Sequence, residues 1–334
     1  MPPTELLITS ADIANAAERV RPHVVRTPLT VSVPMSERSG ATVAIKAEHQ
    51  QLTGSFKLRG ALNKVMTLGA QEKAAGIVTA SSGNHGIATA TAAAIDGTRC
   101  TVYLPSIASP AKVAAIRRAG AEVIMVDNTD TYEAEKQARA AAVQGGATYV
   151  SPYNDLGVVA GQGTIGVEIT EQGLETGLGP IDAVVVAVGG GGLISGVATW
   201  IRTHSPTTRI IGASPTNDQA MAASVAAGEI IAPPAHETFS DGTSGAVEPG
   251  SVTFDLCRTL VHDWMLIDEV DIAGGVANMV DDHHQLVEGS AGVALTAAEQ
   301  YGAQHPGQTV VTITCGANVS SASLRVMLEA AQPG

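Results

Sequence analysis

The chain has 334 residues, of which 45% are hydrophobic, 15% are charged and only 3% are aromatic. This length and this composition are typical of a globular protein with a sizeable core in one or two domains. The formal net charge of −13 argues against a nucleic-acid partner and against binding to an anionic membrane surface.

The cysteines and the N-terminal segment favour a location inside the cell. Cys100, Cys257 and Cys315 lie far apart and form no CxxC pair, so neither a disulfide framework nor a zinc cluster is expected. Residues 1–20 lack the basic and apolar regions of a signal peptide. No apolar run reaches the roughly 18–20 residues that span a bilayer. We therefore expect a cytoplasmic protein.

Short runs rich in β-branched residues alternate with Ala-rich stretches along most of the chain. After a first run at 42–48, a helix is expected from about residue 55 to 68. Further runs lie at 76–80, 100–105, 121–127, 182–188, 209–215 and 309–314. Strands that alternate with helices indicate βαβ units, so we expect an α/β fold with parallel sheets and helices on both faces.

The alternating units also suggest how the chain divides. Residues 54–150 contain a block of such units that we expect to fold as a small domain, and residues 1–53 and 151–334 would form the large domain. No long linker or fixed-period repeat interrupts the chain. Folds of this class bind ligands at the carboxyl ends of parallel strands, so the site is expected between the two domains.

A run of four glycines is the strongest local signal. Gly189, Gly190, Gly191 and Gly192 join a buried strand to a helix, where backbone N–H groups can bind an anion. The run lacks the lysine of a Walker loop and the spacing of a dinucleotide fingerprint. A lone phosphate monoester fits better. The alternative is a turn that only allows tight packing of strand and helix.

A second loop repeats this design at residues 81–85, again between an expected strand and a helix. Its donors could bind a carboxylate at the start of the helix. Ordinary turn and N-cap chemistry explains the same residues equally well. The loop consists of Ser81, Ser82, Gly83, Asn84 and His85.

Two further residues have chemistry that their local sequence leaves open. Lys57, within GSFKLRGA, lies at an expected helix start and is either a solvated charge or an amine prepared for covalent chemistry. The positive end of the helix dipole would help to keep that amine neutral. Cys315 lies at the end of the last strand, where a lone cysteine is commonly a small buried hydrophobe. A helix-start lysine, a phosphate loop and a second anion loop together suggest pyridoxal 5′-phosphate.

With these motifs the sequence resembles the fold-type II pyridoxal-phosphate enzymes of the threonine dehydratase and serine racemase group, from about residue 20 to 325. The resemblance implies the two-domain fold of the tryptophan synthase β subunit, with the cofactor bound by the large domain. It implies that Lys57 is the Schiff-base residue, that Phe56 lies beside the cofactor ring and that Gly189–Gly192 bind the phosphate. Asn84 would reach the phenolic oxygen of the cofactor, and Cys315 would take the place of a serine that faces the pyridine nitrogen.

The same resemblance implies the substrate site and the reaction. Ser81, Ser82, Gly83 and His85 would bind the substrate carboxylate. Lys57 would remove the α-proton of a β-hydroxy amino acid, such as threonine, serine or 3-hydroxyaspartate, and the products would be a 2-oxo acid and ammonia. A neutral partner such as Cys315 leaves the pyridine nitrogen largely unprotonated, which favours loss of the β-substituent.

Three alternatives to this ammonia-lyase remain open. An amino-acid racemase would use the same Lys57, with Ser82 on the opposite face of the ring. A nucleotide-dependent oxidoreductase could have the same α/β scaffold. A binding module without catalytic activity would need only the anion loops.

Other features of the sequence concern metals, regulation and assembly. Metal-dependent relatives have a Glu and an Asp where this chain has Ser214 and Ala220, with Asp218 between them, so no metal is expected. With these replacements, FSDGTSGAVEPG (residues 239–250) and TCGAN (residues 314–318) resemble the dehydratase branch linked with hydroxyectoine breakdown and 3-hydroxyaspartate. Residues 280–284 (VDDHH) are expected on a solvated helix face, and Glu288 is either near the cofactor or at the surface. We expect a homodimer or higher homo-oligomer and, since the chain ends at residue 334, no feedback inhibition by isoleucine.

Overall fold

Two sheets organise the chain in the computed structural model, which describes residues 6–331. The larger sheet has six strands in the order β1-β2-β10-β7-β8-β9, and the smaller has four in the order β5-β4-β3-β6. The strands are β1 (Leu29–Val31), β2 (Thr42–Lys46), β3 (Ile77–Ala80), β4 (Cys100–Pro105), β5 (Glu122–Val126), β6 (Thr148–Tyr149), β7 (Ala183–Ala187), β8 (Arg209–Pro215), β9 (Asp263–Ile267) and β10 (Thr309–Ile313).

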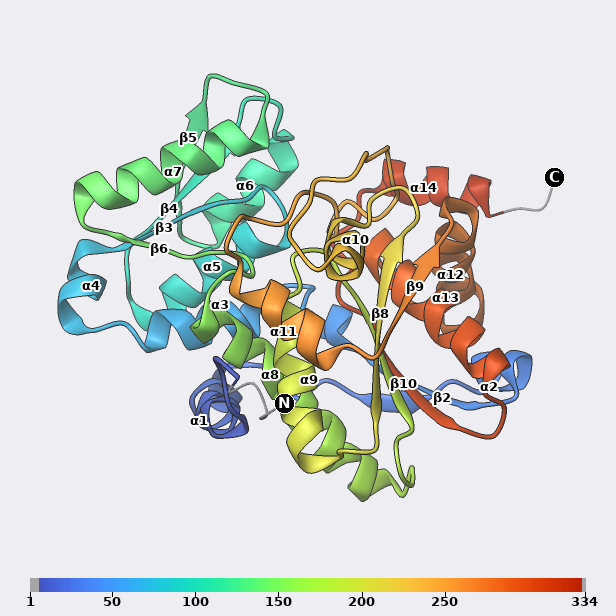
Figure 1. Cartoon of the computed structure of the whole chain (residues 1–334). Coiled ribbons are helices and arrows are strands. Elements are labelled where there is room, and N and C mark those ends of the chain that lie inside the picture. The colour runs from blue at the N-terminus through green and yellow to red at the C-terminus, as the bar shows by residue number, and fades with distance from the viewer. Residues whose placement is uncertain (1–5, 332–334) are drawn as a thin grey trace.

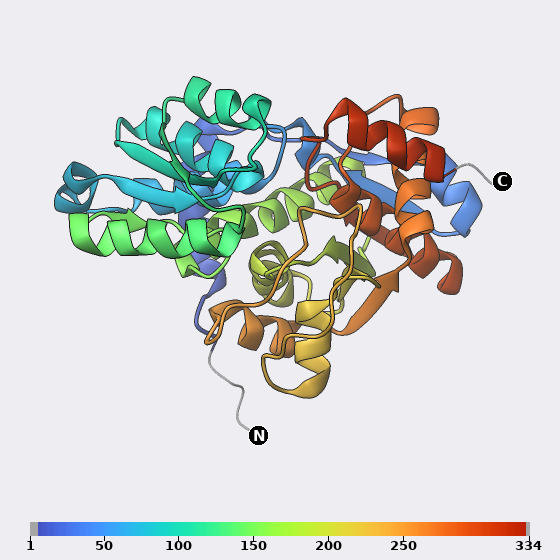
Figure 2. The ribbon, with the colours of Figure 1, turned by 90° about the horizontal axis from the view of Figure 1, so that it is seen from above.

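Helices surround both sheets. In Figure 1 the small sheet and α5, α6 and α7 lie in one lobe, the large sheet and α12, α13 and α14 in the other, and Figure 2 shows the same separation from above. The helices are α1 (Ser10–Val20), α2 (Val33–Ser39), α3 (Lys57–Met66), α4 (Ala70–Ala75), α5 (Asn84–Asp96), α6 (Pro110–Arg118), α7 (Thr131–Gly145), α8 (Leu156–Thr176), α9 (Gly192–His204), α10 (Ala220–Ala227), α11 (Val252–Leu260), α12 (Glu269–His283), α13 (Gly289–Gln304) and α14 (Ser321–Ala330), with short 3₁₀ turns at Arg21–His23 and Glu48–Gln50.

Strand direction confirms the α/β class that the alternation predicts. Every strand pair is parallel except β1 with β2, whose short edge strand runs antiparallel. All five residues of the central strand β7 are buried, as expected for a parallel sheet covered by helices on both faces. Within residues 6–331, no helix combines the length and the apolar character needed to cross a membrane. The domain boundaries at 53/54 and 150/151 stay a prediction, which the presence of two separate sheets favours.

Helix α8 packs between α3 and α9 and so fixes the position of one relative to the other. At its contact with α3, a Cβ atom at Gly161 would overlap the carbonyl oxygen of Arg59. At its contact with α9, a Cβ atom at Gly163 would lie 2.9 Å from the carbonyl oxygen of Gly196. Because the backbones approach so closely, small residues on α8 set the relative position of the helix that starts at Lys57 and the helix that follows the glycine run.

Substituting Gly161 with alanine tests this packing. We expect Gly161→Ala to lower the free energy of unfolding by about 1–3 kcal/mol, since the added methyl group must displace backbone. Gly145→Ala is the matched control, because a Cβ atom there meets nothing within 4 Å. That exposed helical position should be neutral or gain up to about 1 kcal/mol. Urea denaturation of both variants measures the difference, and equal effects would contradict the packing argument.

Candidate active site

One cavity contains all the site residues that the sequence singles out. It has a volume of about 400 Å³ and lies between the two lobes, at the carboxyl ends of β3, β7 and β10. Such a volume is typical of a small-molecule site. The predicted residues that line it are Phe56, Lys57, Ser81, Ser82, Gly83, Asn84, His85, Gly189, Gly190, Gly191, Gly192 and Cys315.

The segment that precedes Lys57 is held by the segment that follows β10. Ser55 and Gly316 form an isolated antiparallel bridge. The Phe56 N–H donates to the carbonyl oxygen of Cys315 at 3.0 Å, and the Ala317 N–H donates to that of Gly54 at 2.8 Å. These bonds bring Lys57 and Cys315 to the same wall of the cavity although they are far apart in the sequence.

Lys57 is the first residue of α3, as predicted, and its amine is poised for chemistry. Burial lowers its pKa to about 8, against the opposing effect of Glu288 and Cys315. The Nζ atom donates to the carbonyl oxygen of Pro152 at 3.0 Å and lies 5.1 Å from the centroid of the Phe56 ring. A sizeable fraction of this amine is therefore neutral, and nucleophilic, near pH 8.

Arg59, two residues after Lys57, anchors the same helix through buried ion pairs. Its guanidinium donates two hydrogen bonds of 2.8 Å to the carboxylate of Glu48 and two, of 2.7 and 2.9 Å, to that of Glu168 on α8. Lys46 on β2 donates to Oε2 of Glu168 at 2.6 Å. Sequence reasoning missed this network. The one available signal was the presence of charged residues within otherwise apolar elements.

The glycine run combines the two interpretations that the sequence left open. The first N–H groups of α9 have no acceptor within the helix, and Gly192 and Leu193 line the cavity; anion binding stays a prediction that this arrangement favours. Close packing also requires the glycines. A Cβ atom at Gly189 would lie 2.7 Å from the carbonyl oxygen of Thr243, and one at Gly190 would overlap the ring of Tyr153. Tyr153 and Thr243 are site residues that the sequence analysis did not identify.

The loop at residues 81–85 leaves the start of α5 open toward the cavity. Gly83 is the N-cap residue and no side chain caps the helix. The hydroxyl of Ser81 accepts a bond from the Gly83 N–H at 3.2 Å, so turn chemistry is present as well. The first N–H groups of α5 remain available to a carboxylate.

His85 lies deepest in this loop. Its Nε2–H donates to the carbonyl oxygen of Val150 at 3.0 Å, and burial lowers its pKa to about 3, so the ring is neutral at pH 7. The other ring nitrogen, Nδ1, is buried and has no hydrogen-bond partner in the described part of the chain, and the same holds for the hydroxyl of Ser290. Two unpaired polar atoms in one cavity indicate a polar ligand.

Glu288 joins the loop at residues 81–85 to the end of β10. It is the N-cap residue of α13 and only 5% exposed, so the surface alternative is wrong. The amide of Asn84 donates to both oxygens of Glu288, at 2.9 and 3.0 Å, and the thiol of Cys315 donates to Oε1 at 3.8 Å. Burial raises the pKa of Glu288 to about 7 and that of Cys315 well above its usual value. The thiol is therefore neutral at physiological pH.

The positions that were considered for metal binding have other partners. The buried hydroxyl of Ser214 donates to the carbonyl oxygen of Val188, and Asp218 accepts from the hydroxyl of Ser244 and from the Gly245 N–H. Ala220 begins α10. Among residues 6–331, no group of three or more His, Cys, Asp or Glu side chains could hold a metal ion.

The side chains of VDDHH point in different directions, as expected. The prediction that they lie on a solvated helix face is only partly correct. Asp282 forms an ion pair of 2.7 Å with Arg38, and His283 forms a hydrogen bond of 3.0 Å with the hydroxyl of Ser32. Both side chains are half-buried and contact residues of α2 or its N-cap, Arg38 and Ser32.

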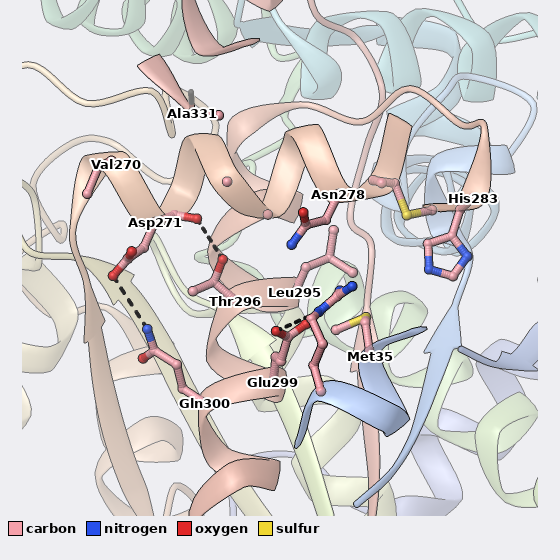
Figure 3. A pocket seen from close by; sticks show the side chains of 14 residues that line it. Met35, Val270, Asp271, Asn278, His283, Leu295, Thr296, Glu299, Gln300 and Ala331 are labelled. Carbon is pink, nitrogen blue, oxygen red and sulfur yellow. Dashed lines mark hydrogen bonds and ion pairs between the residues drawn. The ribbon is translucent and has the colours of Figure 1, made fainter. Parts of the chain in front are cut away.

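A second cavity of about 320 Å³ lies among α2, α12 and α13 (Figure 3). Arg38 pairs there with Glu299 at 2.9 Å, and the amide of Gln300 donates to Asp271. Arg38, Glu299, Gln300 and Asp271 thus bond within these pairs rather than converging on a common point. No site residue that the sequence predicts lines this cavity, so the first cavity is the candidate active site.

Comparison with known proteins finds a matching family and similar structures. A family model described as "Pyridoxal-phosphate dependent enzyme" matches residues 20–316. The L-threonine ammonia-lyase of Thermotoga maritima is 37% identical over 87% of this chain and 71% of its own length. Threonine deaminase isoform 2 of Solanum lycopersicum superposes with a TM-score of 0.91 at 31% identity, over 100% of this chain and 99% of that one. Maize serine racemase superposes with a TM-score of 0.88 at 31% identity, over 96% and 97%.

The reactivity of Lys57 should reveal its lowered pKa. In protein stripped of any bound cofactor, the rate at which an amine reagent labels Lys57 is expected to rise with pH and to reach half its maximum near pH 8, since only the neutral amine attacks. For free N-acetyl-lysine, the labelling rate should reach half its maximum near pH 10.4, the ordinary pKa of a lysine side chain. Mass spectrometry of the labelled peptide measures the rate. A half-maximum near pH 10 in the folded protein would contradict the effect of burial.

Proposed function

The chain belongs to the family of pyridoxal-phosphate dependent enzymes, and on this premise we propose that it is an ammonia-lyase that converts a β-hydroxy amino acid to a 2-oxo acid and ammonia. The observation that carries the proposal is the half-buried amine of Lys57, whose pKa is lowered to about 8, in the same cavity as two open helix N-termini. The sequence similarity to threonine ammonia-lyases supports the same reaction. It also favours this reaction over the nucleotide-dependent oxidoreductase.

The residues of the cavity fit pyridoxal 5′-phosphate. A primary amine with a pKa of about 8 is partly neutral and can attack the aldehyde group of the cofactor. The N–H groups at the start of α9 can donate hydrogen bonds to its phosphate. The unpaired polar atoms of His85 and Ser290 leave donors and acceptors for further polar groups. Phe56, Asn84 and Cys315 would complete the cofactor contacts. When bound, the cofactor supplies an electron sink for the charge that develops at the substrate α-carbon.

The chain's own residues would divide the reaction among them. The N–H groups and hydroxyls at Ser81, Ser82, Gly83 and His85 would hold the substrate carboxylate and so orient the α-proton. The amine of Lys57 would accept that proton, and hydroxide would leave from the β-carbon. After its release, the unsaturated amine product hydrolyses to the 2-oxo acid and ammonia.

The neutral state of Cys315 supports elimination over reactions that need a long-lived carbanion. A neutral thiol whose S–H donates a hydrogen bond to Glu288 has no second proton to donate to a cofactor nitrogen. That nitrogen would stay largely unprotonated, the electron sink would be weaker, and prompt loss of the β-hydroxyl would be favoured.

The substrate class that we propose includes threonine, serine and 3-hydroxyaspartate. The cavity volume of about 400 Å³ suits a cofactor with a small amino acid. Ammonia release from threonine, serine and each stereoisomer of 3-hydroxyaspartate distinguishes among them.

Racemisation of an amino acid is the second candidate. It is supported by Ser82, which lines the same cavity as Lys57 and could exchange a proton with the opposite face of the α-carbon, and by the similarity to maize serine racemase. Chiral chromatography of the substrate during turnover tests it.

We also propose a cytoplasmic homodimer. All three cysteines are free and buried, which suits a reducing compartment. The assembly proposal rests on the sequence resemblance, and the mass in solution by light scattering tests it.

Replacing Lys57 is the direct test of the proposed function. The purified protein is expected to be yellow, borohydride should fix the colour onto Lys57, and Lys57→Ala should lower ammonia release by at least about a thousandfold, because both the attachment point and the base are lost. The matched control is Lys136→Ala, on an exposed face of α7. A colourless protein, or a Lys57→Ala variant that still deaminates threonine, would contradict the proposal. If Lys57→Ala still binds the amino acid as tightly as the wild type does, and neither protein releases ammonia, the binding module without catalytic activity is favoured.

The Cys315→Asp variant tests the role of the neutral thiol. An aspartate there would share the site with the carboxylate of Glu288 and would protonate a cofactor nitrogen, so we expect dehydration to slow and side reactions to increase. Cys315→Ser keeps a small neutral group and should retain most of the activity. The ratio of ammonia released to side products measures the effect, and an unchanged ratio in Cys315→Asp counts against this role.

A further inference from the structure

Lys112 is a cation in the active-site cavity for which neither the fold nor the reaction described above provides a role. It lies in the first turn of α6, where its N–H donates to the hydroxyl of the N-cap residue Ser109 at 3.3 Å. Its side chain lines the same cavity as Lys57. Apart from these two lysines, the residues that line the cavity carry no cationic side chain, since His85 is neutral.

Most lysines of this protein pair with a carboxylate. Four of the six lysines in the sequence form ion pairs within 4.0 Å of a carboxylate, namely Lys46, Lys64, Lys73 and Lys136. Lys57 and Lys112 form none with the acidic residues among 6–331, and these are the two that line the cavity. Lys112 is exposed, and since it lines the cavity without a carboxylate partner among residues 6–331, its ammonium is free to pair with an anionic ligand there.

The topology places Lys112 on the wall that would hold the substrate carboxylate. The loop at residues 81–85 follows β3 and Lys112 follows β4, and these strands are paired in parallel. Their carboxyl ends are therefore neighbours. Thr131, the first residue of α7, follows the next strand, β5, and adds a hydroxyl to the same cavity.

The acidic residues of the cavity lie on segments from the large-sheet lobe. Asp241 and Glu288 both line it, and the negative charge of Asp241 helps to raise the pKa of Glu288, so the two lie close together. A ligand with a second carboxylate would be repelled from them and attracted to Lys112.

We propose that Lys112 binds a second carboxylate, on the side chain of the substrate, and so selects a β-hydroxy amino acid with a dicarboxylate skeleton over its neutral analogues. This inference rests on the proposed ammonia-lyase function and deepens it. The α-carboxylate would bind at residues 81–85 and the side-chain carboxylate at Lys112, with the amino group of the substrate left to the Lys57 side of the cavity.

Binding of aspartate and asparagine to the holoenzyme tests the proposal without depending on turnover. The two ligands have nearly the same shape and differ in one negative charge. We expect the wild type to bind aspartate more tightly, and Lys112→Met to reduce this preference about tenfold, or about 1.4 kcal/mol. Lys112→Arg should keep the preference, and Lys136→Met is the control that removes a charge from the same lobe outside the cavity. Calorimetry measures each Kd.

Salt and turnover give two further readouts. Raising the salt concentration should weaken the binding of aspartate but not that of asparagine. In the same variants, Lys112→Met should raise KM for a 3-hydroxyaspartate stereoisomer about tenfold and change that for threonine less than about twofold, as expected for loss of one attractive charge.

The outcomes separate this inference from the proposed function. If threonine is deaminated but the wild type prefers asparagine, or Lys112→Met leaves the preference unchanged, the function stands and the role of Lys112 is overturned. If no amino acid releases ammonia but aspartate binding depends on Lys112, the function fails and the charge recognition is supported.

Discussion

The position of Lys57 depends on the buried ion pairs of Arg59. A guanidinium without contact to water must be paired, because an isolated buried charge is destabilising by several kcal/mol. Glu48 and Glu168 supply the partners from the 3₁₀ turn after β2 and from α8. Three segments from different parts of the chain are thereby held at one point. Since Arg59 lies in the first turn of α3, the same bonds determine where that helix begins and where the amine of Lys57 lies.

A single physical cause, burial, acts on all three titratable groups at the inner wall of the cavity. Removal from water disfavours charge, so it lowers the pKa of Lys57 and raises those of Glu288 and Cys315. Near neutral pH the site consequently has an amine that is partly free, a carboxyl group near its midpoint and a neutral thiol. These protonation states suit proton abstraction by an amine together with a weak electron sink.

Small residues have two functions in this fold. At α8 they allow the helices on either side to approach closely, and in the glycine run they expose N–H groups while the ring of Tyr153 and the backbone at Thr243 pack against them. Backbone contact and anion binding therefore need the same residues at Gly189 and Gly190. The phosphate loop and the tight turn were alternatives in the sequence; the structure confirms the tight packing, and phosphate binding stays a prediction that the open start of α9 favours.

The sequence alone determined the α/β class and predicted the two anion loops and the importance of Lys57, because these depend on local patterns of strands, glycines and helix starts. It did not reveal the Arg59 network, the burial of Glu288 or the unpaired charge of Lys112. Each of these is defined by partners far away in the chain, such as Asn84 for Glu288, or by the lack of one. Burial and charge pairing arise only when distant segments meet, so the tertiary structure alone decided which charged side chains are structural and which are free to bind a ligand.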